Sequence, residues 1–220
     1  MKLILLLKFI YRITKYFLSP TKRYSFLLYS VFKNRPKSIL EVGVYNGNRA
    51  IELIETAKIF NKNITYYGFD LFEEFYNQKS TINKELSKYP LSTKNIKNKL
   101  KIFKNVNLIK GNTKKTLPKF IKKKIQIDFV FLDGGHSVQT IKSDWSSIKK
   151  IITNKSYVIF DDYYEIKKKV LNKYGCNKII NSLNEKKYQK EIFSLGDIFY
   201  DKFLNYKKKI FMVGVKKIWF

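Results

Sequence analysis

The sequence predicts an α/β domain built around a parallel sheet, and two observations carry this prediction. After Arg35-Pro36, short runs rich in β-branched and aromatic residues alternate with longer stretches of helical periodicity, which is the pattern of βαβ units. Glycines stand directly after several of the short runs, where a missing Cβ allows tight turns and a close approach of the backbone to a ligand. Because the chain has 220 residues and 45% of them are hydrophobic, we expect one domain with a sizeable core.

The first 18 residues predict a basic amphipathic helix that ends before Ser19-Pro20. Lys8, Arg12 and Lys15 are spaced to share one face of this helix. They interrupt the apolar run well below the roughly 18 residues that a membrane-spanning helix needs, and no small-residue cleavage site of a secretory signal follows. The helix is therefore expected to be retained, and either to lie on an anionic membrane surface or to pack on the domain or on a partner subunit.

The chain divides into a helical extension at residues 1–35 and a main domain at residues 36–220. A polar stretch at residues 73–104 is too long for an ordinary connection, which favours a lid over the substrate. Within the main domain the short apolar runs predict strands at Ser38–Val42, Thr65–Phe69, Val106–Ile109, Ile127–Leu132, Tyr157–Phe160 and Ile210–Val215. The periodic stretches predict helices at Asn48–Phe60, Lys114–Lys124 and Val138–Ile152.

The composition narrows the function without deciding it. Lys and Arg total 45 against 17 Asp and Glu, a formal net charge of +28, so a polyanion or an anionic membrane is one candidate partner. The lysines are scattered over many segments, which favours a solvated surface over a concentrated nucleic-acid footprint. Cys176 and His136 are the only residues of their kinds, so one chain cannot build a disulfide framework or a Cys/His zinc site. The sequence also lacks the GxSxG, GxxxxGKS/T and GxGxxG motifs of several common enzyme classes.

Two strand ends carry residues suited to binding a nucleotide-like cofactor. Glu41, Gly43 and Gly47 belong to an E-x-G-x-x-x-G turn between a predicted strand and a predicted helix, where glycine lets the backbone approach a ligand. Asp70 ends the next predicted strand, at the place where such sheets offer an acid to ribose hydroxyls. The turn alone is a weak signal, and Asp70 taken alone is better explained as a helix cap.

Two further strand ends place acids close to the only histidine. One predicted strand is followed by Asp133, two glycines and His136, and the next is followed by Asp161 and Asp162. Neighbouring strands lie about 5 Å apart, so the three aspartates are expected to meet at one edge of the sheet. The mutual repulsion of three carboxylates favours a divalent cation among them, and an all-oxygen set suits Mg²⁺ or Mn²⁺. The alternatives are that lysines neutralise these acids or that the acids cap helices.

In order and spacing, these motifs and the stretch from Val106 to Asn112 resemble the landmarks of class I S-adenosylmethionine-dependent methyltransferases. More narrowly, they resemble the group of macrocin and aminocoumarin sugar O-methyltransferases and their cephalosporin-pathway relative. The resemblance covers about Ser38 to Val215 and leaves the N-terminal helix outside. It implies a Rossmann-like three-layer αβα sandwich with a seven-stranded, mostly parallel sheet. It also implies S-adenosylmethionine as cofactor and Mg²⁺ or Mn²⁺ held by Asp133, Asp161 and Asp162.

The resemblance also assigns the cofactor residues: Glu41, Gly43 and Gly47 border the methionine part, Asp70 takes the ribose hydroxyls, Asn112 lies near the adenine, and Asp133 completes the set. One departure concerns the base. The sugar methyltransferases often read Asp-Gly-Asp, with the second acid as base, whereas here Gly135 precedes His136. We therefore expect His136 as general base, with Asp133 as its catalytic neighbour, because an imidazole titrates near working pH. The alternative for His136 is helix capping or support of another residue.

The expected function is metal-assisted O-methylation of a hydroxyl on a sugar, glycan or related metabolite. The alternatives are methylation of RNA ribose, and a non-catalytic module on this fold that binds membrane or nucleic acid. No Asp/Asn/Ser-Pro-Pro-aromatic run follows the fourth strand, and no proline adjoins Cys176, which argues against base methylation. The expected partner is a small-molecule or glycan substrate, with membrane contact through residues 1–18 as a further candidate and nucleic acid less favoured. The expected location is the cytoplasm, with or without membrane association.

Overall fold

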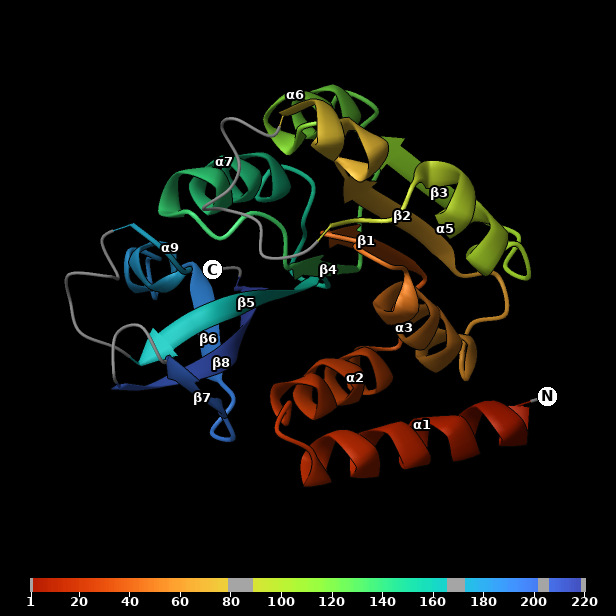
Figure 1. Ribbon diagram of the computed structural model, residues 1–220, viewed down its shortest axis with the longest axis horizontal. Helices are drawn as coiled ribbons and strands as arrows, with labels where there is room; N and C mark the ends of the chain where they lie inside the picture. Colours follow the sequence, from red (N-terminus) through yellow and green to blue (C-terminus); the bar gives the residue numbers. More distant parts are fainter. Residues whose placement is uncertain (1, 79–88, 166–172, 202–205, 219–220) are drawn as a thin grey trace.

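The computed structural model describes residues 2–78, 89–165, 173–201 and 206–218. A central sheet lies between two layers of helices (Figure 1). The described strands follow the order β3-β2-β1-β4-β5-β8-β6, and β7 pairs with β8 beside this path. Their bounds are β1 Ser38–Val42, β2 Thr65–Asp70, β3 Val106–Lys110, β4 Phe129–Leu132, β5 Tyr157–Glu165, β6 Tyr188–Ile192, β7 Asp197–Asp201 and β8 Tyr206–Lys217.

The predicted α/β fold with a mostly parallel sheet is confirmed. Strands β1 to β5 pair in parallel, and β8 runs antiparallel to β5, β6 and β7. The sheet has eight strands within the described residues, not seven. Strand β6 was not predicted, because its sequence, Tyr-Gln-Lys-Glu-Ile, is a polar run without an apolar strand pattern. Its residues are half-buried or exposed. Strand β7, which begins and ends with aspartate, was not predicted either.

Helices cover both faces of the sheet and enclose one apolar core on each. The core on the first face joins Phe9, Leu27, Leu53 and Ile96, and the core on the other face joins Leu117, Trp145 and Ile179. The helices on the first face are α1 Lys2–Leu18, α2 Arg23–Asn34, α3 Asn48–Lys58 and α5 Thr93–Leu100. Those on the second face are α6 Thr113–Ile121, α7 Val138–Ile148 and α9 Asn177–Asn181.

Helix α1 is the outermost element and packs on the domain, which was one of the two roles left open for it (Figure 1). The ring of Phe9 stacks on Phe32 of α2 with centroids 4.4 Å apart. Two of its basic side chains turn inward: Lys8 donates to Glu55 of α3 at 2.7 Å, and Arg12 also binds Glu55. Among the described residues, no helix combines the length and apolar character needed to cross a membrane.

The segment predicted as a lid lies partly outside the described residues, at 79–88. Its described parts are a 3-10 helix, η1 Phe72–Gln78, and helix α5. The second part lies against the glycine turn after β1: Leu91 N–H donates to the Tyr45 carbonyl at 3.1 Å, and Lys99 Nζ donates to the Asn46 carbonyl at 2.8 Å. This segment is therefore placed beside the candidate site, while its role as a lid stays a prediction.

Candidate active site

The turn after β1 brings its backbone against the end of β4. Gly43 has φ +95°, a region that side chains with a Cβ rarely adopt. Its N–H donates to the Phe69 carbonyl on β2 at 2.8 Å. A Cβ at Gly43 would lie 2.0 Å from the carbonyl oxygen of Asp133, so glycine is what allows these two strand ends to meet. The tight glycine turn expected from the sequence is present.

The second glycine of the motif begins helix α3. Gly47 has φ +76° at the N-cap position, and the nearest atom to a Cβ built there is Cδ1 of Ile96, at 3.2 Å. The side chain of Ile96 from α5 therefore lies over the turn. Because the first N–H groups of a helix attract negative charge, this end of α3 is a suitable place for a carboxylate of a bound ligand.

Two residues assigned to the cofactor also hold local backbone. Asp70, at the end of β2, accepts the Tyr45 N–H at 2.7 Å and the Phe72 N–H at 3.3 Å. Burial raises the pKa of Asp70 above its usual value, although these backbone donors oppose the shift. Asn112 caps α6, where its side chain accepts the Lys114 N–H at 3.0 Å. Their contacts with a cofactor stay predictions.

Glu41 lies beneath the turn and is fully buried. The Tyr66 hydroxyl donates to its Oε2, while Oε1 has no hydrogen-bond partner among the described residues. Burial raises the pKa of Glu41 to about 8, and the hydrogen bond from Tyr66 lowers it only in part. At neutral pH the side chain is therefore mainly the uncharged acid, and it supports the turn from below without lining the surface of the site.

In the wild type, the free energy of unfolding is expected to fall as pH rises, and replacing Glu41 with glutamine should remove this pH dependence. Between the unfolded pKa of 4.5 and the folded pKa of about 8, the native state holds a proton that the unfolded state has lost, so stability falls as pH rises, by up to about 1.4 kcal/mol per pH unit. The amide of Glu41→Gln does not titrate. Urea unfolding from pH 5 to 8 should show this slope in the wild type and a flatter one in the variant; equal slopes would contradict a buried neutral Glu41.

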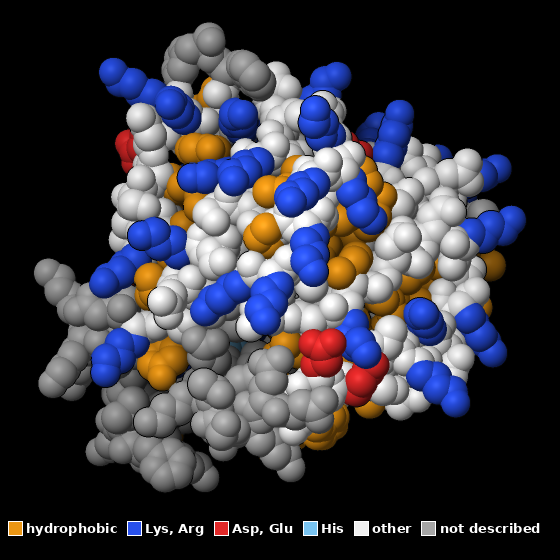
Figure 2. All heavy atoms as spheres, turned by 90° about the horizontal axis from the view of Figure 1, so that it is seen from above, with side chains coloured by type: hydrophobic (Ala, Val, Ile, Leu, Met, Phe, Trp, Pro, Cys, Tyr) orange, Lys and Arg blue, Asp and Glu red, His pale blue; other side chains and the backbone are white. Residues whose placement is uncertain are grey.

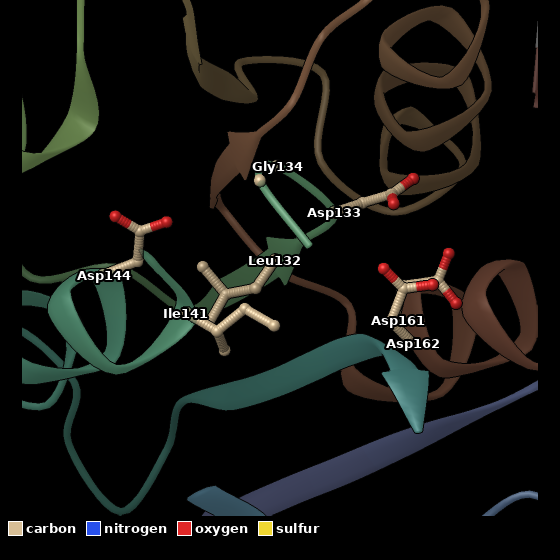
Figure 3. Close-up of a pocket in the computed structure, with 8 residues that line it drawn as sticks. Leu132, Asp133, Gly134, Ile141, Asp144, Asp161 and Asp162 are labelled. Atoms are coloured by element: carbon tan, nitrogen blue, oxygen red, sulfur yellow. The ribbon is translucent and has the colours of Figure 1, made fainter. Parts of the chain in front are cut away.

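The three aspartates predicted to converge do lie together, with Asp133 directly after β4 and with Asp161 and Asp162 inside β5, which continues to Glu165 beyond the predicted strand end at Phe160. Figure 3 shows Asp133, Asp161 and Asp162 on one side of a small hollow and Asp144 of α7 on the other. Asp133 lies close to Asp161. Burial raises the pKa of Asp133 well above its usual value, and the charges of Asp161 and Asp162 add to the shift. Burial and the neighbouring acids therefore both favour the protonated form of Asp133.

Within the described residues, these aspartates are not arranged as the predicted Mg²⁺ or Mn²⁺ site. Arg23 of α2 binds both oxygens of Asp161, with Nε at 2.7 Å and Nη2 at 2.9 Å. His136 binds Oδ2 of Asp162. In the part of the chain that the structure describes, no group of three or more His, Cys, Asp and Glu side chains is arranged to hold a metal ion. The carboxylates are instead satisfied by a guanidinium and an imidazole.

His136 and Asp162 form a hydrogen-bonded pair through Nδ1 of the imidazole. Burial lowers the pKa of His136, but the hydrogen bond to Asp162 outweighs it, so the pKa is raised overall. The same bond holds the pKa of Asp162 below its usual value, against the effect of burial. The side chain of His136 is 29% exposed. Because Nδ1 faces Asp162, Nε2 is the ring nitrogen left to exchange a proton with a substrate.

A β-bulge in β5 sets the direction of the acidic pair. The register between β5 and β8 shifts between Phe160 and Tyr163, and Asp162 has a left-handed φ of 62°. The Cys176 N–H donates to the Asp162 carbonyl at 3.0 Å and holds this conformation. Bulges commonly re-aim side chains beside active sites. Here the bulge directs Asp161 to Arg23 and Asp162 to His136.

Sequence reasoning missed Arg23, which belongs to the segment assigned to an N-terminal extension. Arg23 is one of 45 basic residues and stands in no local motif. Its two carboxylate partners, Asp161 and Asp197, lie 138 and 174 residues away in the sequence. The available signal was a basic residue opening an otherwise apolar helix, Arg-Tyr-Ser-Phe-Leu-Leu. A buried arginine needs an acidic partner, so that signal would have directed attention to the strand-end aspartates.

Comparisons with known proteins found a sequence relative and solved structures of similar fold. The chain is 31% identical over 62 residues to an uncharacterized protein of Acanthamoeba polyphaga mimivirus, and the match covers 28% of each chain. A structure of an rRNA methylase from Streptococcus thermophilus superposes with a TM-score of 0.59 at 12% identity, covering 90% of this chain and 97% of that one. An O-methyltransferase from Bacillus cereus, in complex with SAH, superposes with a TM-score of 0.57 at 14% identity, covering 98% and 90%.

At these identities the solved structures show the shared fold, which is that of class I methyltransferases. The family assignment comes from the sequence itself, since the model of a methyltransferase domain matches residues 40–163, more than half of the chain. The matched region contains the glycine turn, Asp70, the Asp133 to His136 motif and the acidic pair. The chain belongs to the methyltransferase domain family.

Proposed function

We propose that this methyltransferase transfers the methyl group of S-adenosylmethionine to a hydroxyl oxygen of a sugar, glycan or related metabolite, with His136 as general base. The observation that carries the proposal is the His136–Asp162 pair at the edge of the sheet, next to the turn where Gly43 meets Asp133. A partly exposed imidazole beside the expected donor site suits deprotonation of a hydroxyl.

The residues present fit the cofactor. The glycine turn follows β1 at the carboxyl edge of the sheet, where this fold binds nucleotide-like cofactors. The N-terminus of α3 suits the cofactor's carboxylate, and Asp70 ends β2, where an acid can bind ribose hydroxyls. S-adenosylmethionine supplies a methyl group activated by its positively charged sulfur. The remaining requirement on the protein is to orient an acceptor hydroxyl in line with that methyl group and to take its proton.

His136 and the aspartates divide this work. Nε2 of His136 accepts the hydroxyl proton as the oxygen attacks, and Asp162 holds Nδ1–H and stabilises the imidazolium that forms. Asp133 lies beside this pair, and burial together with the charges of Asp161 and Asp162 raises its pKa. The proposal contains no metal step, because Asp161 is bound by Arg23 and Asp162 by His136.

Methylation of RNA ribose is the competing function suggested by the net charge of +28. On the face shown in Figure 2, the Lys and Arg side chains of the described residues are spread out, with apolar and uncharged side chains between them. A nucleic-acid footprint is typically a concentrated patch or stripe. The spread of charge therefore favours a small acceptor.

The test begins with calorimetric titration of the full chain with S-adenosylmethionine, using ATP as an adenosine-containing control. Donor carrying a labelled methyl group is then offered with a panel of hydroxylated metabolites and glycans. We expect saturable binding of the donor and label on an acceptor oxygen. Failure to bind the donor would leave a non-catalytic module, and label on RNA ribose, with binding that weakens steeply as salt rises, would favour the competing function.

A further inference from the structure

We propose that the guanidinium of Arg23 takes the place of a divalent cation among the aspartates that follow β4 and lie within β5. In this role Arg23 is a positioning residue: it neutralises the acidic cluster and fixes Asp161, and the site needs no metal to assemble. The claim about cation binding stands apart from the proposed function, because it can be tested without turnover.

Arg23 binds two carboxylates of the cluster at once. Its planar guanidinium binds Asp161 through two donors, at 2.7 and 2.9 Å, which is the bidentate geometry that arginine forms with carboxylates. A third donor, Nη1, binds Asp197 of β7, and the backbone N–H of Arg23 binds the other oxygen of Asp197 at 3.0 Å. Three side chains from α2, β5 and β7 are thereby joined.

The cluster is enclosed, so its charges cannot be balanced by water. The side chain of Arg23 is 9% exposed, and those of Asp161 and Asp197 are at most 1% exposed. Burial lowers the pKa of Arg23, but Asp161 outweighs it and Asp133 adds to the effect, so the pKa is raised overall. Asp133 therefore lies within electrostatic reach of the same guanidinium. Leaving such carboxylates buried without a cation is strongly unfavourable.

Arg23 is also held in place from its own side. The guanidinium lies over the ring of Tyr24 at 4.6 Å from the centroid, and Arg49 of α3 lies over the same ring at 3.6 Å. Because α2 is buried between α1 and the sheet, withdrawal of Arg23 would require movement of the whole helix. A free metal ion in solution therefore competes with a cation that is covalently part of the fold.

The experiment is a titration of the chelator-treated full chain with Mn²⁺, followed by calorimetry and by the thermal unfolding midpoint. The wild type is expected to show no saturable Mn²⁺ binding and no shift of the midpoint at millimolar Mn²⁺. In Arg23→Ala the loss of the buried pair should lower the midpoint by about 10 °C. Mn²⁺ should then bind to the freed aspartates and recover part of that loss.

Two further variants separate this role from general damage. Lys22→Ala removes an exposed positive charge one residue away and is expected to behave like the wild type. Arg23→Lys keeps one charge without the bidentate geometry and should fall between wild type and Arg23→Ala. Stoichiometric binding of Mn²⁺ by the wild type, or equal Mn²⁺ responses in wild type and Arg23→Ala, would overturn the proposal. The wild-type titration decides the matter even if Arg23→Ala does not fold.

A separate observation concerns the outer face of α1, and from it we infer a docking surface for anionic lipid. The face turned away from the domain is apolar along the helix: Leu7 is 58% exposed, Tyr11 66% and Leu18 77%. The other exposed apolar residues of this face are Leu3, Ile4, Ile10 and Phe17. Soluble proteins rarely expose a contiguous apolar face of this kind unless it is an interaction site.

Charge decides which occupant this outer face suits. Helix α1 contains no acidic residue, and its Lys2 and Lys15 are exposed. These lysines can bind lipid phosphates while the apolar residues insert at the boundary between headgroups and acyl chains. A second copy of this chain would bring two proteins of +28 together, which opposes association. An anionic lipid surface is therefore the occupant that the charges favour.

The test is sedimentation with vesicles of phosphatidylcholine, with and without phosphatidylserine. We expect binding only to the phosphatidylserine vesicles and a loss of about tenfold or more in Leu7→Gln/Tyr11→Gln, because two inserted side chains are removed. Tyr29→Gln, an exposed residue of α2, is the matched control and should bind normally. Equal binding by the double variant, or a wild-type dimer in solution that the double variant loses, would overturn the inference.

Discussion

His136→Gln is expected to lower kcat for methyl transfer by about 10²- to 10⁴-fold, the usual contribution of a general base. Glutamine keeps a hydrogen-bonding side chain beside Asp162 but cannot accept a proton at neutral pH. The donor affinity should change little, because His136 is assigned to the acceptor. Calorimetry with S-adenosylmethionine and steady-state kinetics on the acceptor found in the screen measure the two effects separately.

Asp162→Asn is the companion variant, because it changes only the orientation and the pKa of the base. The hydrogen bond to Asp162 raises the pKa of His136 against the effect of burial, and only neutral His136 can act as base. In the wild type, kcat/KM should therefore fall as pH drops through a value above 6.5. In Asp162→Asn the pKa should fall, so this acid limb moves to lower pH while the maximal rate decreases. An unchanged pH profile in both variants would remove His136 from the mechanism.

The parts of the fold that the sequence predicted correctly are those with strong periodic signals. The strands β1 to β5 were located, because each contains an apolar or β-branched run followed by a glycine or an acid, although β5 extends five residues beyond the predicted end at Phe160. Strands β6 and β7 were missed: β6 is a polar run, β7 is a short Ile-Phe-Tyr run between two aspartates, and both pair with β8. Helix α2 was not resolved as a separate element from the helical extension.

In the candidate site, too, only the residues that follow or belong to predicted strands could be placed from the sequence. The sequence predicted that Asp133, Asp161 and Asp162 would meet, because the ends of neighbouring parallel strands must lie side by side. It could not predict what balances their charge. That depends on Arg23, which reaches the site from a helix outside the matched region, and long-range contacts of a single residue leave no periodic trace. Whether these aspartates bind a metal depends on this contact, which arises from tertiary packing.

The glycine turn provides the second large effect: Gly43→Ala is expected to destabilise the protein by about 3 kcal/mol or more and to abolish binding of S-adenosylmethionine. The added Cβ would lie 2.0 Å from the carbonyl oxygen of Asp133 and 2.6 Å from its carbonyl carbon. Backbone atoms cannot rotate away, so β1 and β4 must separate. The left-handed φ of +95° adds a cost of roughly 1–2 kcal/mol.

Gly47→Ala is the matched control, because it makes the same chemical change in the same turn. Its φ of +76° carries a similar backbone cost, but the nearest contact of a Cβ there is the flexible end of Ile96, at 3.2 Å. We therefore expect a loss of about 1–2 kcal/mol and weakened but measurable donor binding. Urea unfolding and calorimetry on both variants give the comparison. Equal effects of the two substitutions would mean that the strain of the turn, and not the contact between the ends of β1 and β4, is what glycine relieves, and the geometry assigned to the donor site would have to be revised.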